Sequence, residues 1–317
     1  MLLITTEDIT SEQLKDLLQQ MPSNYEVCHV STPLHESSID FERVQIWVTY
    51  GYDVTEELLQ RMPHLKWIQI FQAGVEHLPF EAINKRNITL TNMRGIHGIP
   101  MAEYTMSMLF HLMGNVQRYK ENQAQTHWDD HALFHEIHGK TATIFGAGTI
   151  GTEIANKLKT IGLSVFGVNT SGDLKEPFDE MYSLEDRHAV LHKSDFVILL
   201  MPVTPQTEHC MSQNEFRHMK QDAHLINLGR GPLIDDEALI EALKLKEIKG
   251  AVLDVFDEEP LLEHHPFWDN DNILITPHVA AKSPRYLDRC IEQFAHNIQV
   301  FPQFNDMKFV VDTTKGY

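Results

Sequence analysis

One segment restricts the fold of this chain more than any other. A short apolar run, Thr141–Phe145, passes directly into Gly146-Ala-Gly148-Thr-Ile-Gly151, and a helical pattern follows. In this strand–turn–helix context the first glycine allows a tight turn, the second lets the backbone approach a pyrophosphate, and the third permits close packing of helix on strand. The free N–H groups at the helix N-terminus favour an anion. The segment therefore predicts a dinucleotide-binding turn, in which the expected contact residues are Gly146, Gly148, Thr149, Ile150 and Gly151.

The rest of the chain alternates short apolar runs with amphipathic helical patterns, which is typical of an α/β protein. Strands are expected at residues 2–5, 25–30, 43–48, 67–71 and 88–91 in a first set, and at 141–145, 164–168, 195–200, 224–228, 250–253 and 272–275 in a second. With 317 residues the chain is long enough for two domains, each with its own core. The runs of the second set are continuously apolar, as in parallel strands buried on both faces.

Helix boundaries and a hinge are also predicted from the sequence. Side-chain caps are expected at Thr10, Thr55, Ser183, Ser212 and Asp235. Two glycines and a proline in Arg94-Gly-Ile-His-Gly-Ile-Pro100 indicate a hinge, and we expect one long buried helix over residues 101–119 after it. A last helix is expected over 285–301. A short strand over 308–311 would then return to the first domain.

Charge and cysteine content exclude several classes of protein. The formal net charge of −19 argues against binding to nucleic acid or to an anionic membrane surface. The three cysteines form no CxxC pair, which favours a reducing compartment. No apolar stretch approaches the roughly 20 residues that span a bilayer, and the first 20 residues do not resemble a signal peptide. A cytoplasmic protein is the expectation.

The end of the strand at 164–168 bears on the choice of dinucleotide. Proteins that select NAD place an acidic residue there, which binds the ribose 2′-hydroxyl. This chain instead has Asn169-Thr170-Ser171-Gly, which exerts no repulsion on a 2′-phosphate. NADP(H) is therefore favoured over NAD(H), with Asn169, Thr170, Ser171 and Lys175 as candidate phosphate ligands. Asp173 is the alternative, because its carboxylate would suit the ribose of NAD(H).

Three further motifs follow expected strands: Asn-Leu-Gly-Arg230-Gly-Pro, Asp254-Val-Phe-Asp-Glu-Glu259-Pro, and Thr-Pro-His278-Val-Ala-Ala. In an open α/β sheet the carboxyl ends of the strands line the ligand crevice, so the three motifs are expected at one pocket. Taken singly, each has a structural alternative. Arg230 would be a surface charge, Glu259 a loop carboxylate before a turn proline, and His278 a hydrogen-bonded loop histidine.

Together with the glycine turn, these motifs resemble the D-isomer-specific 2-hydroxyacid dehydrogenase family over nearly the whole chain. Phe71-Gln-Ala-Gly-Val-Glu76 is similar to the loop that faces the substrate in that family. The resemblance implies an α/β fold of two Rossmann-like domains, in which the cofactor domain is inserted into a smaller, flavodoxin-like substrate domain. Residues 1–97 plus 284–317 would form the substrate domain, and residues 98–283 the dinucleotide-binding domain.

The resemblance also implies roles that make chemical sense. Arg230 would bind the oxygens of a 2-keto acid through its planar guanidinium, and His278 would donate the proton that neutralises the developing alkoxide. Glu259 would orient the imidazole and favour its charged form. Backbone N–H groups of Ala73, Gly74 and Val75 would hold the substrate carboxylate. Contacts with the cofactor are further expected from two residues after strand ends, Pro202 and Asp254.

Within the family, the chain most resembles the glyoxylate/hydroxypyruvate reductases, which reduce a small 2-keto acid to the D-2-hydroxy acid. An NAD-linked D-lactate-type dehydrogenase or another D-2-hydroxyacid dehydrogenase is the alternative. A dinucleotide-sensing binding protein is a third possibility. A homodimer is expected from the resemblance alone. Four histidines would share one face if their segment were helical, but no metal site is expected there: His127, His131, His135 and His138.

Overall fold

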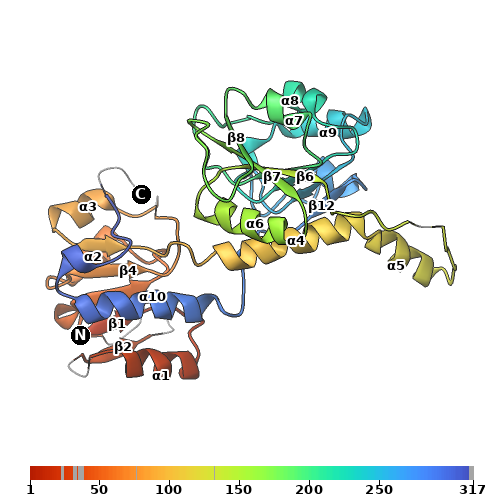
Figure 1. Ribbon diagram of the computed structural model, residues 1–317. Helices are drawn as coiled ribbons and strands as arrows, with labels where there is room; N and C mark the ends of the chain where they lie inside the picture. The colour runs from red at the N-terminus through yellow and green to blue at the C-terminus, as the bar shows by residue number, and fades with distance from the viewer. Residues whose placement is uncertain (23–24, 31–33, 35–38, 76, 132, 314–317) are drawn as a thin grey trace. The chain divides into compact units, whose positions relative to one another are not determined.

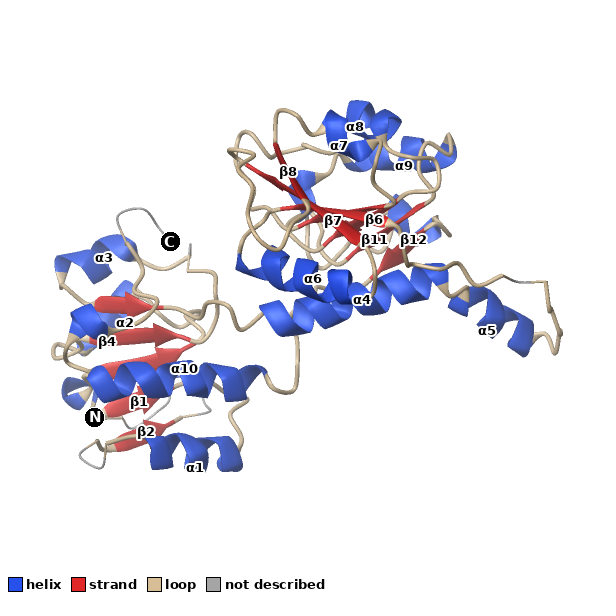
Figure 2. Cartoon of the chain, viewed as in Figure 1, coloured by secondary structure: helices blue, strands red, loops and turns tan. Residues whose placement is uncertain are grey.

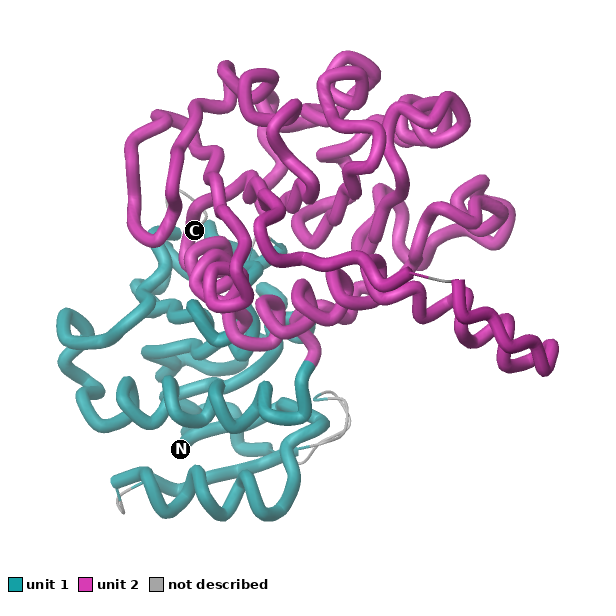
Figure 3. The backbone as a smooth tube through the Cα atoms, turned by 45° about the vertical axis from the view of Figure 1, so that its right-hand side comes forward, with its two compact units in different colours: residues 1–96, 283–317 teal, residues 97–282 magenta. Residues whose placement is uncertain are grey.

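The computed structural model describes residues 1–22, 25–30, 34, 39–75, 77–131 and 133–313. The chain divides into two compact units, shown in two colours in Figure 3. One unit comprises residues 1–96 and 283–317, and the other comprises residues 97–282. The second unit is therefore an insertion in the sequence of the first. No helix among the described residues is long and apolar enough to cross a lipid bilayer.

The first unit is a parallel sheet between two layers of helices. Its strands are β1 (Leu2–Ile4), β2 (Val27–His29), β3 (Ile46–Thr49), β4 (Trp67–Ile70) and β5 (Thr89–Thr91), in the order β2-β1-β3-β4-β5. Its helices are α1 (Ser11–Gln20), α2 (Glu56–Arg61), α3 (Phe80–Lys85) and α10 (Tyr286–Val300). The helices α1 and α10 lie together on one side of the sheet in Figure 2 and bury one apolar cluster, while α2 and α3 bury another. This order is that of a flavodoxin-like fold.

The second unit is a larger parallel sheet with the order β12-β11-β10-β9-β6-β7-β8. Its strands are β6 (Thr141–Phe145), β7 (Ser164–Asn169), β8 (Glu180–Ser183), β9 (Phe196–Leu199), β10 (His224–Asn227), β11 (Gly250–Leu253) and β12 (Ile273–Ile275). Its helices are α4 (Gly98–Met113), α5 (Val116–Ala124), α6 (Thr149–Thr160), α7 (His188–Leu191), α8 (Gln213–His218) and α9 (Asp236–Lys244). In Figure 1, α4 and α6 lie on one side of this sheet and α7, α8 and α9 on the other. The predicted doubly wound α/β fold is therefore confirmed in both sheets.

The sequence predicts a single long helix over residues 101–119, and this prediction is wrong. The helix α4 ends at Met113, and α5 begins at Val116 after a break at Gly114 and Asn115. Asn115 adopts a left-handed backbone conformation with φ 50°, which asparagine tolerates better than most residues. The break directs α5 away from the sheet, as Figure 1 shows, and no side chain of α5 is buried.

Two smaller predictions also fail. Ser183 is not a helix cap but the last residue of β8, a strand that the sequence analysis missed because only part of its surface is buried. No strand forms over 308–311 in the described chain. The tail instead makes one antiparallel bridge, Thr91 with Val310, and a hydrogen bond from Val311 N to Leu90 O. The other expected caps are confirmed. The side chains of Thr10, Thr55 and Asp235 accept hydrogen bonds from their helices, and Ser212 forms a capping box with Glu215.

Candidate active site

The candidate residues of the larger unit follow the carboxyl ends of parallel strands, and therefore lie along one edge of the sheet. The glycine turn follows β6, Asn169 ends β7, Pro202 follows β9, Arg230 follows β10, Asp254 and Glu259 follow β11, and His278 follows β12. The expectation that these strand ends share one edge is met by the sheet order.

The glycine turn has the geometry that its sequence requires. Gly146 has φ 114°, in the region that favours glycine, and a Cβ on Gly151 would lie 2.2 Å from the Gly146 carbonyl oxygen. A Cβ on Gly148 would meet no described protein atom within 4 Å, so open space lies beside this backbone. The helix α6 begins next, and no side chain caps its N-terminus. These residues fit a dinucleotide pyrophosphate, because both the space and the uncapped N–H groups remain for a ligand.

At the end of β7 the Asn169 side-chain oxygen closes a turn, so it is not available to accept a hydrogen bond from a ligand. The Asn169 side-chain oxygen accepts hydrogen bonds from Ser171 N at 3.1 Å and from Gly172 N at 2.6 Å. The Asn169 amide NH₂ is left for other partners, and the hydroxyl of exposed Thr170 lies beside it in sequence. Further along the loop, Lys175 Nζ donates to the carbonyl oxygen of Ala147 at 2.8 Å, within the glycine turn. The loop therefore brings a positive charge to the glycine turn.

Close backbone contacts join the loops along the edge of the sheet. A Cβ on Gly146 would lie 3.1 Å from the Leu200 carbonyl carbon, and one on Gly229 would lie 3.0 Å from the Met201 carbonyl oxygen. A Cβ on Gly231 would lie only 2.0 Å from the carbonyl carbon of Phe256. The loop that carries Arg230 is thus packed directly against the loop that carries Glu259.

His278 and Glu259 form a hydrogen-bonded pair. The distance between His278 Nδ1 and Glu259 Oε2 is 2.7 Å, and Glu259 Oε1 accepts from the Phe256 backbone N–H at 3.0 Å. The side chains remain open to solvent, with 51% of His278 and 35% of Glu259 exposed. Among the described residues His278 Nε2 has no hydrogen-bond partner. The imidazole is therefore oriented by the carboxylate, and its second nitrogen is available to a ligand.

Asp254 is buried, with 1% of its surface exposed, and its carboxylate organises the loop that carries His278. Oδ1 accepts from Thr276 Oγ1 at 2.6 Å and from Val279 N at 2.9 Å, and Oδ2 accepts from Ala280 N at 2.9 Å. The sequence analysis assigned Asp254 to the cofactor and missed this role. Its direct contact with the cofactor stays a prediction.

Asn227 is a second residue whose role the sequence did not reveal. Its side-chain amide donates to the Arg230 carbonyl oxygen at 2.9 Å, and its side-chain oxygen accepts from Gly229 N at 3.1 Å. Asn227 is fully buried and braces the turn, while the exposed Arg230 guanidinium donates to the carbonyl of Gly229 at 2.8 Å. A signal was present, because a buried polar residue at a strand end requires partners in the following turn.

The loop that resembles a substrate-binding segment follows β4 in the smaller unit. The carbonyl oxygen of Ala73 accepts from Asn92 Nδ2 at 2.7 Å, and Val75 is buried in the core. Glu76, the last residue of that motif, lies outside the described residues. The role of the backbone N–H groups of Ala73, Gly74 and Val75 stays a prediction.

The histidine segment after α5 does not form a helical face. The helix ends at Ala124, and His127, His131, His135 and His138 all lie in irregular structure or turns. Within the part of the chain that the structure describes, no three His, Cys, Asp or Glu side chains are grouped as metal ligands would be.

Comparison with known proteins identifies a common family. Residues 106–280 match the family described as the D-isomer specific 2-hydroxyacid dehydrogenase, NAD binding domain. A glyoxylate reductase of Thermofilum pendens is 31% identical over 252 residues, which cover 77% of this chain and 74% of that protein.

Solved structures give the same picture over the full length. A D-isomer specific 2-hydroxyacid dehydrogenase family protein from Aeromonas salmonicida has a TM-score of 0.88 and 31% identity, with 98% of each chain covered. The NADPH-dependent glyoxylate/hydroxypyruvate reductase of Sinorhizobium meliloti, determined with NADP and sulfate, has a TM-score of 0.80 and 27% identity. That comparison covers 100% of this chain and 99% of the other.

Proposed function

The chain belongs to the D-isomer specific 2-hydroxyacid dehydrogenases and is an oxidoreductase. We propose that it uses NADPH to reduce a small 2-keto acid, of the glyoxylate or hydroxypyruvate kind, to the D-2-hydroxy acid. The observation that carries the proposal is the His278–Glu259 pair, which lies on the same sheet edge as the glycine turn. The second imidazole nitrogen of His278 has no hydrogen-bond partner among the residues that the structure describes. The glyoxylate reductase names among its relatives support this substrate class.

The residues have distinct tasks in this reaction. The glycine turn and the α6 N-terminus would hold the dinucleotide, which would supply the hydride for the carbonyl carbon. Arg230 binds the carboxylate and carbonyl oxygens of the keto acid through its fixed fork of N–H donors. As the carbonyl oxygen gains negative charge, His278 donates the proton of Nε2 to it and then recovers a proton from solvent. Glu259 holds Nδ1, which keeps the ring in the orientation for that transfer.

The two units divide the binding of the ligands. Residues 97–282 bind the dinucleotide through Gly146, Gly148, Gly151 and the first residues of α6, Thr149 and Ile150. Pro202 and Asp254 contribute further contacts at the same edge. Residues 1–96 with 283–317 contribute the backbone N–H groups of Ala73, Gly74 and Val75, which hold the substrate carboxylate. Support for this division comes from the uncapped α6 N-terminus and from the family resemblance of the loop at residues 71–75.

Preference for NADPH rests on the groups at the end of β7. A ribose 2′-hydroxyl is best bound by an acidic acceptor, whereas a 2′-phosphate requires donors and positive charge. The acceptor oxygen of Asn169 is already used within its own turn, so its NH₂, the hydroxyls of Thr170 and Ser171, and Lys175 remain. These are ligands for a phosphate. The complex of the Sinorhizobium meliloti reductase with NADP agrees with this preference.

The direct test follows absorbance at 340 nm with purified protein, NADPH or NADH, and glyoxylate, hydroxypyruvate or pyruvate. We expect rapid oxidation of NADPH with glyoxylate or hydroxypyruvate and a D-configured product from hydroxypyruvate. In Lys175→Gln, the KM for NADPH should rise roughly 10-fold while that for NADH changes little. Turnover of pyruvate with NADH as the best pair would instead establish the D-lactate-type activity. No oxidation with any pair would overturn the proposal.

We also propose that the protein is a homodimer through the segment that leaves the sheet at α5. This segment carries unusually exposed apolar side chains, with 89% of Trp128, 72% of Leu133 and 57% of Phe134 accessible. Exposed apolar groups gathered in one segment favour a protein interface. The test is sedimentation equilibrium, in which Trp128→Ser combined with Phe134→Ser should halve the mass of the wild type. A monomeric wild type would exclude the dimer.

A further inference from the structure

The backbone at His278 requires support from its neighbours. Its φ of 51° lies in the left-handed region, which residues other than glycine adopt only when the surrounding structure holds them there. Asp254 provides that support at three consecutive positions. Its backbone oxygen accepts from His278 N at 2.8 Å, and its carboxylate accepts from Val279 N and Ala280 N, each at 2.9 Å. The position of the His278 side chain therefore depends on Asp254.

The carboxylate of Asp254 is itself held by a chain of two hydroxyl groups. Thr276 Oγ1 donates to Asp254 Oδ1 at 2.6 Å, and the distance between Tyr104 Oη and Thr276 Oγ1 is also 2.6 Å. Thr276 has a single hydroxyl proton, which it gives to Asp254, so Tyr104 is the donor in the second hydrogen bond. Burial is the largest influence and raises the pKa of Tyr104, the hydrogen bond with Thr276 lowers it, and the charge of Asp254 raises it, so that the pKa is about 12. The phenol thus keeps its proton at neutral pH.

Tyr104 lies on α4, the first helix of the larger unit, 172 residues before Thr276 in the sequence. Its ring packs against the apolar cluster that α4 and α6 form with the sheet, so the hydroxyl is fixed by the packing of the ring. A hydroxyl attached to a packed ring has little freedom. It is suited to fix the orientation of the next group in the chain.

We propose that Tyr104 is a positioning residue for catalysis, which holds the proton donor His278 in place through Thr276 and Asp254. The inference rests on the proposed role of His278 in keto acid reduction and adds residues that contact neither substrate nor hydride. Its consequence is that removal of one hydroxyl group on α4 lowers the rate of proton donation. Binding of keto acid and of cofactor should stay close to the wild type, because Arg230 and the glycine turn are untouched and Asp254 keeps its hydrogen bonds from Val279 N and Ala280 N.

The experiment compares four variants of the full-length enzyme. Tyr104→Phe removes only the hydroxyl and Thr276→Val removes the middle of the chain, whereas Thr276→Ser restores a hydroxyl at the same position. The matched control is Thr105→Val. Thr105 is the next residue on α4, is fully buried, and gives its hydroxyl proton to the Met101 carbonyl of the same helix at 2.7 Å. The control therefore removes a buried hydroxyl from α4 without touching the chain to His278.

We expect Tyr104→Phe to lower kcat roughly 10-fold and Thr276→Val roughly 10²-fold, since small displacements of a catalytic group have effects of this size. The KM for keto acid and the Kd for NADPH, measured by fluorescence quenching, should change less than about twofold. Thr276→Ser should recover most of kcat, and Thr105→Val should turn over at the wild-type rate.

Wild-type turnover in Tyr104→Phe and Thr276→Val would overturn the inference. An equal loss of kcat in Thr105→Val would also overturn it, because the loss would then reflect only the stability of α4. Failure of the proposed function is recognised separately. In that case His278→Ala keeps its activity, or the wild type oxidises no cofactor with any keto acid.

Discussion

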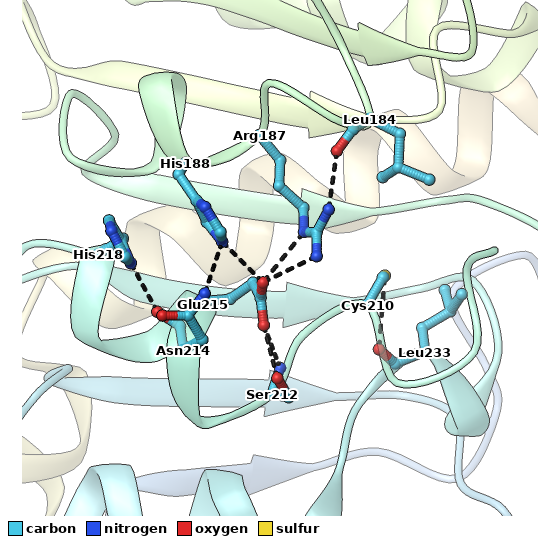
Figure 4. A network of polar contacts seen from close by, with 9 residues as sticks. All are labelled: Leu184, Arg187, His188, Cys210, Ser212, Asn214, Glu215, His218 and Leu233. Carbon is cyan, nitrogen blue, oxygen red and sulfur yellow. Dashed lines mark hydrogen bonds and ion pairs between the residues drawn. The ribbon is translucent and has the colours of Figure 1, made fainter.

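The larger unit contains two pairs of glutamate and histidine with nearly the same hydrogen bond but different surroundings. His278 Nδ1 lies 2.7 Å from Glu259 Oε2, and His188 Nε2 lies 2.8 Å from Glu215 Oε1. Glu215 is almost fully buried, with 3% of its side chain exposed, whereas 35% of Glu259 is exposed. Figure 4 shows Glu215 at the centre of contacts from α7, α8 and the loop before α8.

The partners of the two carboxylates explain the difference. Glu215 also accepts from Arg187 Nη2 at 2.9 Å and from Ser212 Oγ at 2.6 Å, as the capping-box residue of α8. The ring of His188 is stacked on His218 with centroids 4.3 Å apart. Protein donors saturate the buried Glu215 carboxylate, so this pair stabilises the fold. The half-exposed His278–Glu259 pair instead lies on the sheet edge that carries the glycine turn. A short Glu–His hydrogen bond alone therefore does not identify a catalytic site.

The largest difference in activity between the two pairs is expected when the arginine that accompanies each pair, Arg230 or Arg187, is replaced by alanine. Arg230→Ala should lower kcat/KM roughly 10³-fold, because the keto acid loses its bidentate partner. NADPH affinity should stay within about twofold. Arg187→Ala should keep its turnover per folded molecule but melt several degrees lower, because Glu215 then loses a charged partner. A loss of turnover in Arg187→Ala with an unchanged melting temperature would contradict the comparison.

A smaller loss of activity is expected when a side chain is added at Gly231, between the loops that carry Arg230 and Glu259. An alanine Cβ at position 231 would lie 2.0 Å from the Phe256 carbonyl carbon, so backbone must move in Gly231→Ala. We expect kcat/KM to fall roughly 10- to 100-fold through displacement of the two side chains. Gly139→Ala is the control: its positive φ of 80°, which Gly231 lacks, adds backbone strain away from the site, and no described protein atom lies within 4 Å of its Cβ position. Kinetics and melting curves of both variants would show whether the effect is specific to the site.

The smallest expected effect is on the pH dependence of folding stability, to which the buried Glu215–His188 pair contributes. Burial by itself raises the pKa of Glu215, but hydrogen bonds from Ser212 and His188 and the charge of Arg187 outweigh it, so its pKa lies below the ordinary value of 4.5. A lowered pKa stabilises the fold above the unfolded value, and the contribution is lost as pH falls through the folded value.

At neutral pH, Glu215→Gln should therefore destabilise the protein by about 1–2 kcal/mol, or a few degrees in melting temperature. The difference from the wild type should shrink below pH about 4.5. The measurement is thermal unfolding from pH 3 to 7, with Glu259→Gln as the control that keeps its stability but loses turnover. A constant difference between Glu215→Gln and wild type across the range would contradict the assignment.

The sequence predicted the parts of the site that depend on local pattern. The strand–glycine–helix motif implies its own geometry, and Gly146 and Gly151 have the conformation and close contact that the pattern requires. The hydrogen bond between Glu259 and His278 was expected from the family resemblance, and the structure shows that the two motifs follow neighbouring strands of one parallel sheet. Both sheets of the α/β fold could be inferred from the alternation of apolar runs and helices.

What the sequence did not predict depends on contacts between distant residues. In the sequence, Tyr104 fits the apolar pattern of a helix, and the residues next to it do not indicate that its hydroxyl reaches Thr276. The turn at Gly114 and Asn115 was missed because the surrounding residues all favour a helix, and only two positions oppose it. The sequence predicted the cap at Ser212 but not the role of Glu215, whose burial with Arg187 appears only in the folded chain.

The central claim is that the Glu259–His278 pair transfers a proton and the Glu215–His188 pair does not. The most direct test measures kcat for keto acid reduction in His278→Ala and His188→Ala, together with the Kd for NADPH and the melting temperature. We predict that His278→Ala lowers kcat roughly 10²-fold or more with unchanged NADPH affinity, while His188→Ala keeps kcat and melts at a lower temperature. Near-normal turnover in His278→Ala, or an equal loss in both variants, would contradict the account.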